Sequence, residues 1–207
     1  MTDTAKELRK RQILESALAV FSEKGLERAS MDDIVRASGL SKGTLYWYFE
    51  NKEALTVAVV KFVFDQFITA ANALVLASAA LPPEQRLRAL ITESLSASDS
   101  AAPMMNIYMD FFVQAWQQPK VRDALIDVYA DYVAIVTAII QDGIDKGAFR
   151  PVKADVAARS IAAAIDGVMA QYLLGNPVWK MQETWKMLAD LLLDGLTNPA
   201  PSDTHRG

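Results

Sequence analysis

The sequence predicts an all-α protein, and three observations lead to that fold class. Apolar residues recur at helical spacing along almost all of the 207 residues, and no stretch alternates like a strand for long. Several of the nine glycines stand where helices are expected to end. With 52% hydrophobic and 22% charged residues, the chain can bury a sizeable core and still face water, which excludes wholesale disorder.

The N-terminal elements are short and well punctuated. The first helix is expected from Thr4 to Lys24, with Gly25 ending it. Ser30 then begins a short helix that ends near Ser38-Gly39, and Asp33 completes a capping-box variant with Ser30. Ser41 begins a further short helix over residues 42–49, and Asn51 begins a long one over about 52–80.

Five more helical segments follow Pro82-Pro83. They are expected over residues 84–98, 103–117, 120–146, 154–174 and 178–196. We therefore divide the chain into an N-terminal three-helix domain (residues 1–51), a larger helical domain (52–197) and a polar tail expected to be disordered (198–207).

Composition excludes several kinds of chemistry. The chain has no cysteine and one histidine, His205, so a disulfide framework, a thiolate metal site and a cysteine nucleophile are excluded. We expect no metal and no cofactor, and a function of binding. The net charge is −4, and residues 1–53 hold equal numbers of basic and acidic side chains. If nucleic acid is bound, a few placed cations must bind it, because the overall field does not attract it.

No segment of the sequence favours a membrane. The charged residues 1–11 are not followed by an apolar segment of the kind a secretory signal needs. The longest charge-free stretch, Gln66–Pro83, holds several polar residues, whereas a membrane span needs roughly 20 mainly apolar ones. We expect a buried helix there, no membrane partner, and a cytoplasmic protein.

The segment Ala37-Ser38-Gly39-Leu40 joins the two short helices into a helix-turn-helix pattern. Gly39 can adopt a positive φ without steric cost, so the chain can reverse within three to four residues. Leu40, Leu45 and Phe49 are expected to hold the second helix against the first helix of the chain. The opposite face then carries Lys42, Gly43, Thr44, Tyr46, Trp47 and Tyr48. Because Gly43 has no side chain, the backbone there can approach a base-pair edge in a major groove.

Residues 21–25, 31–49 and 51–55 together resemble the TetR family of bacterial repressors. The combination of Gly43, the aromatic run of residues 46–49 and the following Lys52-Glu53 is far more specific than a bare helix-turn-helix. The resemblance implies that Ser41, Lys42, Gly43 and Thr44 lie at base edges. It implies phosphate contacts for Ser30, Tyr46, Tyr48 and Lys52, with Trp47 on the same face. Arg28 and the cluster over residues 6–11 are further plausible contacts, although that cluster also fits a solvated helix end, and Ser30 and Ser41 are helix caps first.

Residues 54–195 hold more apolar material than a DNA-reading head needs. Members of the TetR family dimerise through their last two long helices, and the resemblance implies the same use of residues 154–174 and 178–196. In the last segment the main apolar stripe is Met181, Trp185, Leu188, Leu192 and Leu196, with Met187 and Leu191 off it. A fully internal core is the alternative for either helix alone.

The segment Met104–Trp116 is the best candidate for a ligand pocket. It interleaves methionines and aromatic residues with Asn106, Asp110 and Gln114, which suits a small apolar or aromatic effector held by a few polar groups. Neighbouring helices can add further wall residues. The candidate ligand-binding residues are Phe67, Met105, Tyr108, Phe111, Phe112, Trp116, Tyr129, Asp166 and Met169.

These features favour a repressor whose dimer binds a palindromic operator and is released by a small, largely hydrophobic effector. One alternative is an all-α enzyme with an apolar pocket, because Asp127/Asp131 and Asp142/Asp145 have spacings that could gather a divalent cation. No histidine lies near either pair, so solvated helix faces explain them better. Another alternative is a DNA-binding protein of the same fold that has no effector.

Overall fold

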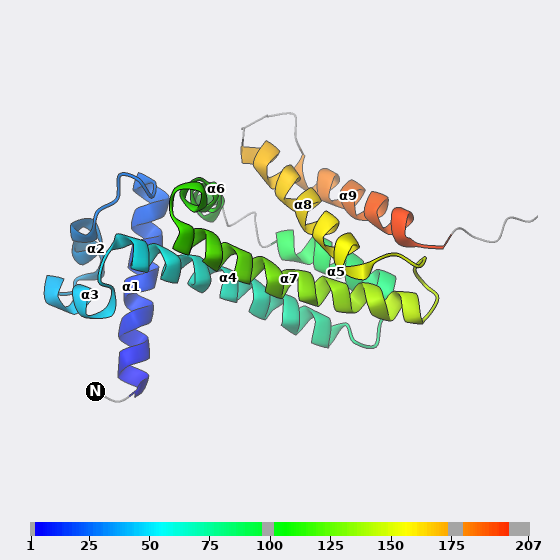
Figure 1. Cartoon of the computed structure of the whole chain (residues 1–207), viewed down its shortest axis with the longest axis horizontal. Coiled ribbons are helices and arrows are strands. Elements are labelled where there is room, and N and C mark those ends of the chain that lie inside the picture. The colour runs from blue at the N-terminus through cyan, green and yellow to red at the C-terminus, as the bar shows by residue number, and fades with distance from the viewer. Residues whose placement is uncertain (1–2, 97–101, 174–179, 199–207) are drawn as a thin grey trace, which may run out of the picture. The chain divides into compact units, whose positions relative to one another are not determined.

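The computed structural model describes residues 3–96, 102–173 and 180–198. Within these ranges the chain folds into α-helices joined by short turns, which confirms the predicted fold class (Figure 1). The helices are α1 (Asp3–Lys24), α2 (Met31–Ser38), α3 (Lys42–Tyr48), α4 (Lys52–Ala77), α5 (Pro83–Ser96), α6 (Ala102–Gln117), α7 (Pro119–Asp145), α8 (Ala154–Leu173) and α9 (Met181–Leu196).

Helix boundaries differ from the predicted ones by a few residues. Helix α3 ends at Tyr48, because Phe49 is extended, although its N–H still bonds the carbonyl of Leu45 at 3.0 Å. Helix α4 ends at Ala77 and not near Ala80, since the next residues form a turn in which the N–H of Leu81 bonds the carbonyl of Ser78. The predicted start of the last helix at Val178 lies outside the described residues.

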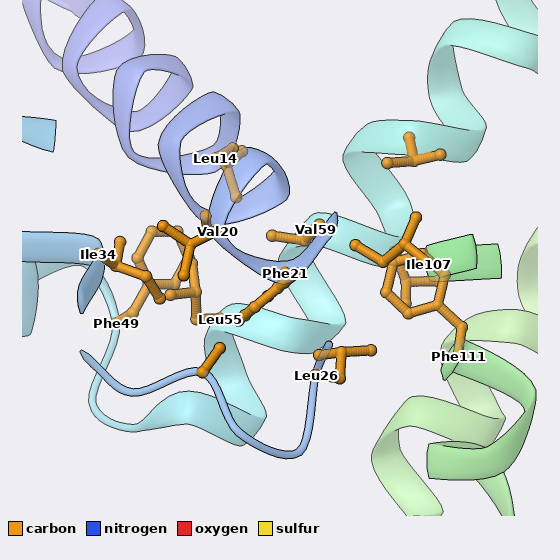
Figure 2. Close-up of a cluster of buried hydrophobic side chains, with 14 of the residues drawn as sticks. Leu14, Val20, Phe21, Leu26, Ile34, Phe49, Leu55, Val59, Ile107 and Phe111 are labelled. Atoms are coloured by element: carbon orange, nitrogen blue, oxygen red, sulfur yellow. The ribbon is translucent and has the colours of Figure 1, made fainter. Parts of the chain in front are cut away.

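The chain forms two compact units. Unit 1 comprises residues 1–67 and 99–130, of which 3–67 and 102–130 are described. Its core brings α1, α2, α3 and the first part of α4 together with α6 and the start of α7, as Figure 2 shows for its central side chains. The largest fully buried members are Phe21, Phe111, Ile13, Leu26, Ile34, Leu45, Leu55 and Ile107. The predicted domain boundary at Asn51 lies inside this unit and stays a prediction.

Unit 2 comprises residues 68–98 and 131–207, within which α5 and α8 pack against α9. Gly143 on α7 packs closely against Phe149, because an added Cβ there would lie 2.1 Å from the ring. Phe149 pairs with Thr197, and the N–H of Arg150 bonds the carbonyl of Leu196 at 2.8 Å. The turn after α7 therefore closes onto the end of α9.

Asn198 does not fit the prediction of a disordered tail. Its side-chain amide donates to the carbonyl of Gly147 at 2.9 Å, which ties it to the turn after α7. The remaining tail residues, 199–207, lie outside the described part of the chain.

Among the described residues, α4 alone is long and apolar enough to cross a membrane by length and composition. A core helix of a water-facing protein passes the same test, and Leu55, Val59 and Val60 of α4 are fully buried in the core of unit 1. The core of unit 1 thus accounts for part of the apolar composition of this helix, while Leu76 is 77% exposed.

A candidate nucleic-acid interface

The start of α2 is held by a complete capping box. The N–H of Asp33 donates to the Ser30 hydroxyl at 3.2 Å, and the N–H of Ser30 donates to the Asp33 carboxylate at 3.0 Å. Lys24 bonds the same carboxylate at 2.6 Å, and Arg36 bonds it as well. The Lys24 ammonium, followed by the Ser30 bonds, holds the pKa of Asp33 well below its usual range. Asp33 is thus the electrostatic anchor of α2, and Ser30 is confirmed as a cap.

The turn between α2 and α3 has the predicted geometry. Gly39 adopts a left-handed conformation with φ of 66°, which favours glycine. Gln12 of α1 donates its side-chain amide to the carbonyl of Ser38 at 2.8 Å, so α1 ties down the end of α2. Leu45 and Ile34 are fully buried and Phe49 nearly so, which leaves only one face of α3 toward solvent.

The first turn of α3 presents small polar groups and bare backbone. Ser41 caps the helix by accepting from the N–H of Thr44 at 3.1 Å, and the Ser41 and Thr44 hydroxyls bond each other at 2.8 Å. An added Cβ on Gly43 would meet nothing closer than the Ser41 hydroxyl at 3.9 Å. Glycine in a helix is less favourable than alanine by up to about 1 kcal/mol, and nothing inside unit 1 requires it here. The backbone of this turn is therefore open to an external surface.

Lys42 stands at the start of this face and has two internal partners. Its ammonium lies 2.8 Å from the Asp32 carboxylate and 5.9 Å from the centre of the Tyr46 ring. The hydrogen bond to Asp32 raises the pKa of Lys42 above its usual value, so the group is a cation at neutral pH. Asp32 was not among the predicted site residues. The signal for it in the sequence is the acid pair Asp32-Asp33, of which a capping box needs only one.

The far end of α3 contacts the first part of α1. The Tyr48 hydroxyl donates to the carbonyl of Lys6 at 3.2 Å, and the Lys6 ammonium lies 5.4 Å from the centre of the Trp47 ring. The Trp47 side chain is 66% exposed, so its indole is available to an external partner. Lys6 thereby joins the surface that α3 presents.

Lys52, at the first position of α4, donates to the carbonyl of Glu27 at 3.0 Å. Partial burial lowers the pKa of Lys52, with Glu27 opposing that shift. The structure thus places all nine predicted DNA-binding residues within unit 1, on the cap of α2, on α3 and its cap, and at the start of α4.

An aromatic cluster joins α4, α6 and α7 within unit 1. Phe64 lies 5.8 Å from Tyr108, and Phe112 lies 5.1 Å from Tyr108 and 6.2 Å from Tyr129, all between ring centres. Phe67 stacks against Phe64 at 6.2 Å, and the hydroxyls of Tyr108 and Tyr129 bond each other at 2.6 Å. Four predicted ligand-binding residues, Phe67, Tyr108, Phe112 and Tyr129, come together here.

Two other predicted ligand-binding residues, Phe111 and Trp116, lie outside this cluster within unit 1. Phe111 is fully buried among the core residues of unit 1, beside Ile107 and near Phe21 (Figure 2). Trp116 is 91% exposed, so its indole forms no inner wall of unit 1. Asp166 and Met169 belong to unit 2, and the side chain of Met105 lies outside the described residues.

Asp110, one of the polar groups expected in the pocket segment, instead bonds the N-terminal part of the chain. Its carboxylate accepts a hydrogen bond from the N–H of Leu26 at 3.0 Å, although 84 residues separate the two. Helix α6 therefore has one side toward the turn between α1 and α2, and Tyr108 and Phe112 on the side of the aromatic cluster.

One member of each aspartate pair considered for a cation has a basic partner. Arg86 and Lys146 bond Asp142 at 2.8 and 2.9 Å, and Lys61 lies 3.7 Å from Asp127. In the described ranges no three histidine, cysteine or acidic side chains form a group that could hold a metal ion.

Helices α2 and α3 form a helix-turn-helix whose inner side chains are buried and whose outer face, with Gly43, is exposed. This arrangement is typical of a DNA-binding transcription regulator, and comparison with known families agrees. The family model of bacterial regulatory proteins of the tetR family matches residues 13–59. The model of the BetI-type transcriptional repressor C-terminal domain matches residues 83–197, more than half of the chain. The chain belongs to the TetR family of transcription regulators, with a C-terminal part of the BetI type, and it is not an enzyme.

Characterised and uncharacterised regulators are similar over most of the chain. The uncharacterized HTH-type transcriptional regulator YfiR of Bacillus subtilis is 31% identical over 159 residues, which is 74% of each chain. The HTH-type transcriptional regulator BetI of Proteus mirabilis is 27% identical over 195 residues, which is 90% of each chain.

Solved structures share the fold. A transcriptional regulator from Saccharomonospora viridis in complex with choline has a TM-score of 0.80 at 22% identity, over 94% of this chain and all of the other. FadR from Bacillus subtilis in complex with stearoyl-CoA has a TM-score of 0.79 at 20% identity, over 90% of this chain and 98% of the other.

Proposed function

We propose that this protein is a cytoplasmic, homodimeric repressor that binds a palindromic operator and leaves it when a small effector binds. The observation that carries the proposal is the exposed face of α3. Ser41, Lys42, bare Gly43 and Thr44 line its first turn, held on a core-packed helix of only seven residues. A major groove admits such a helix, and its N-terminal residues reach base edges.

We assign the phosphate contacts to α3 itself and to the first residues of the neighbouring helices. Tyr46 and Tyr48 offer hydroxyls, Lys52 offers a cation at the start of α4, and Ser30 stands at the start of α2. Contacts to phosphates do not distinguish one DNA sequence from another, but they fix the position of the helix-turn-helix on the duplex. The Tyr48 hydroxyl donates to the Lys6 carbonyl and Lys52 donates to the Glu27 carbonyl, so each of these phosphate contacts requires exchange of that partner.

Dimerisation is assigned to the outer faces of α8 and α9. Two members of the predicted apolar stripe of α9, Trp185 and Leu196, are buried within unit 2. Among the described residues, the large apolar side chains left exposed are Met187 and Leu191 on α9, at 58% and 63%, and Val156 and Tyr172 on α8. A self-complementary interface between two copies of the chain would bury these side chains.

The effector is assigned to the aromatic cluster of α4, α6 and α7. Rings and two tyrosine hydroxyls suit a molecule that is mainly apolar, with one or two polar groups. The bound choline and stearoyl-CoA of the two structural neighbours differ greatly in size and charge. The fold alone therefore does not determine which effector binds, so we assign that choice to the side chains of this cluster.

The first test is selection of operator fragments from genomic DNA, followed by titration of α3 and α4 variants. Lys42→Ala and Thr44→Ala should change base preference. Lys52→Ala should weaken all sequences alike and lower the salt slope by about one. If none of these three changes affects the binding curves, α3 is not the recognition helix.

The second test separates the dimer from the head. Leu191→Glu places a charge in the proposed contact, so it should yield monomers by sedimentation and weaken operator binding by about 100-fold or more, because each half-site alone is weak. Gln182→Glu, an exposed polar position on the same helix, is the matched control and should stay dimeric. A Leu191→Glu dimer with normal affinity contradicts this interface.

The third test addresses the effector. A library of apolar and aromatic molecules is screened for release of the operator, with Phe112→Ala as the insensitive variant. By linkage, operator DNA should weaken effector binding by the same factor that effector weakens operator binding. Tight binding of effector without release would favour a DNA-binding protein that has no effector switch.

A further inference from the structure

The cation best placed to read bases is already paired inside the protein. The Lys42 ammonium lies 2.8 Å from the Asp32 carboxylate and over the Tyr46 ring at 5.9 Å. Both charged side chains are more than half exposed, so water and DNA can reach the pair. An exposed pair of this kind contributes little to folding, and its role must be sought elsewhere.

Asp32 and Asp33 both lie in the first turn of α2, where an acidic side chain favours the N-terminus of the helix. Asp33 completes the capping box and binds Lys24 and Arg36, whereas the Asp32 carboxylate pairs with Lys42 of the next helix. A carboxylate on the DNA-facing side of a DNA-binding protein opposes binding, because it meets the phosphates of the duplex. Its presence therefore needs a further reason, connected with Lys42.

The reason lies in the chemistry of lysine. A lysine ammonium is a compact point charge that binds any phosphate, and phosphates are identical in every sequence. A carboxylate 2.8 Å away offsets much of that charge at a distance, so phosphates attract the pair weakly. An ammonium has three donors, and with one used by Asp32 two remain for acceptors in direct contact, such as O6 and N7 of guanine.

We propose that Asp32 is a specificity-determining residue, which holds Lys42 toward the base edges and prevents it from clamping phosphates of unrelated DNA. This inference rests on the proposed function, since it requires α3 to enter the groove. It assigns to α2 a part in recognition that direct contact with a base would not reveal. The Asp32 carboxylate lowers the affinity of the protein for every DNA sequence, and it lowers the affinity for unrelated sequences more than the affinity for the operator.

The experiment compares two duplexes of equal length and composition, the selected operator and a shuffled version of it, with the full-length protein. Asp32→Asn should raise affinity for the shuffled duplex by about two- to fivefold at low salt, the range expected of an exposed ion pair. Affinity for the operator should rise less, so the ratio of the two falls. The salt slope for the shuffled duplex should also steepen, because the released Lys42 gains a phosphate.

Two controls make the outcome decisive. Asp123→Asn removes the same charge from an exposed pair, with Arg122 on α7, and should leave the ratio unchanged. In a Lys42→Ala background, Asp32→Asn should no longer change the ratio. An unchanged or higher ratio for Asp32→Asn, or an equal fall without Lys42, overturns the inference. If Lys42→Ala itself leaves operator affinity and base preference intact, the assignment of α3 fails instead, so the two failures are distinguishable.

Discussion

Helices α3 and α6 both belong to unit 1, and they use their side chains in opposite ways. Helix α3 buries Leu45 and presents the rest of its surface, whereas α6 buries Ile107 and Phe111 and has its neighbouring aromatic side chains half-buried. The exposed helix can meet a large rigid partner without moving. The core and aromatic-cluster sides of α6 can admit a partner only if their packing changes, which is what a switch requires.

The pair of adjacent phenylalanines on α6 gives the largest expected effect. Phe111→Ala should lower the free energy of unfolding by about 3–5 kcal/mol, because it empties a fully buried site in the core. Phe112→Ala, in the aromatic cluster, should lose much less stability and should lose effector response instead. Urea unfolding of both variants measures the difference. Equal losses would mean that α6 has no separate core side and ligand side.

Gly43 tests the opposite property of α3. Gly43→Ala should leave the protein at least as stable, since its added methyl group meets open space and alanine favours the helix. It should nevertheless weaken operator binding by tenfold or more, about 1.4 kcal/mol, because the methyl group holds the backbone away from the bases. Fluorescence anisotropy and urea unfolding report the two quantities. Unchanged affinity would show that no close approach occurs at Gly43.

Asp110 links the two helices being compared, because its hydrogen bond connects α6 to the turn before α2 and so to the helix-turn-helix that contains α3. Asp110→Ala leaves the Leu26 N–H without its acceptor, at a cost of about 1–2 kcal/mol. Hydrogen exchange of the Leu26 amide should accelerate accordingly. Asp110→Asn keeps an acceptor at the same position and should largely retain the protection. Equal exchange rates in all three proteins would mean that the bond does not constrain the turn.

The smallest effect concerns pH and the anchor of α2. The pKa of Asp33 is lowered in the folded protein, so its stabilisation is complete above the unfolded pKa, near 3.9, and is lost as pH falls through the folded value. The difference in urea midpoint between wild type and Asp33→Asn should be constant from about pH 7 to 5 and shrink below about pH 4. A difference that persists undiminished at low pH would contradict this role of Asp33.

The accuracy of the sequence analysis follows the range of the interactions involved. The caps at Ser30, Ser41 and Asn51 and the turn at Gly39 were predictable, because each depends on residues within four positions. The family resemblance was carried by the same short segment. What surrounds a helix was less accessible, since it depends on contacts between distant parts of the chain.

Helices that are apolar on several sides show this limit most clearly. Residues 191–193 of α9 are all leucine, so periodicity alone could not tell that Leu193 is buried and Leu191 exposed. On α6, Phe111 and Phe112 are chemically identical, and only the packing of α1 against α6 separates them. The bond from Asp110 to Leu26 spans 84 residues and left no local signal.

The uneven exposure of the tryptophans gives the molecule an optical property. Trp47 and Trp116 are open to water and Trp185 is buried, so a small quencher such as acrylamide should reach the first two and spare the third. The ammonium of Lys6 stands over the Trp47 ring, and a duplex lying on α3 would cover both. With Trp116 and Trp179 replaced by phenylalanine, loss of quenching on adding DNA would report occupancy of the head, without an attached dye and with Trp185 as an internal reference.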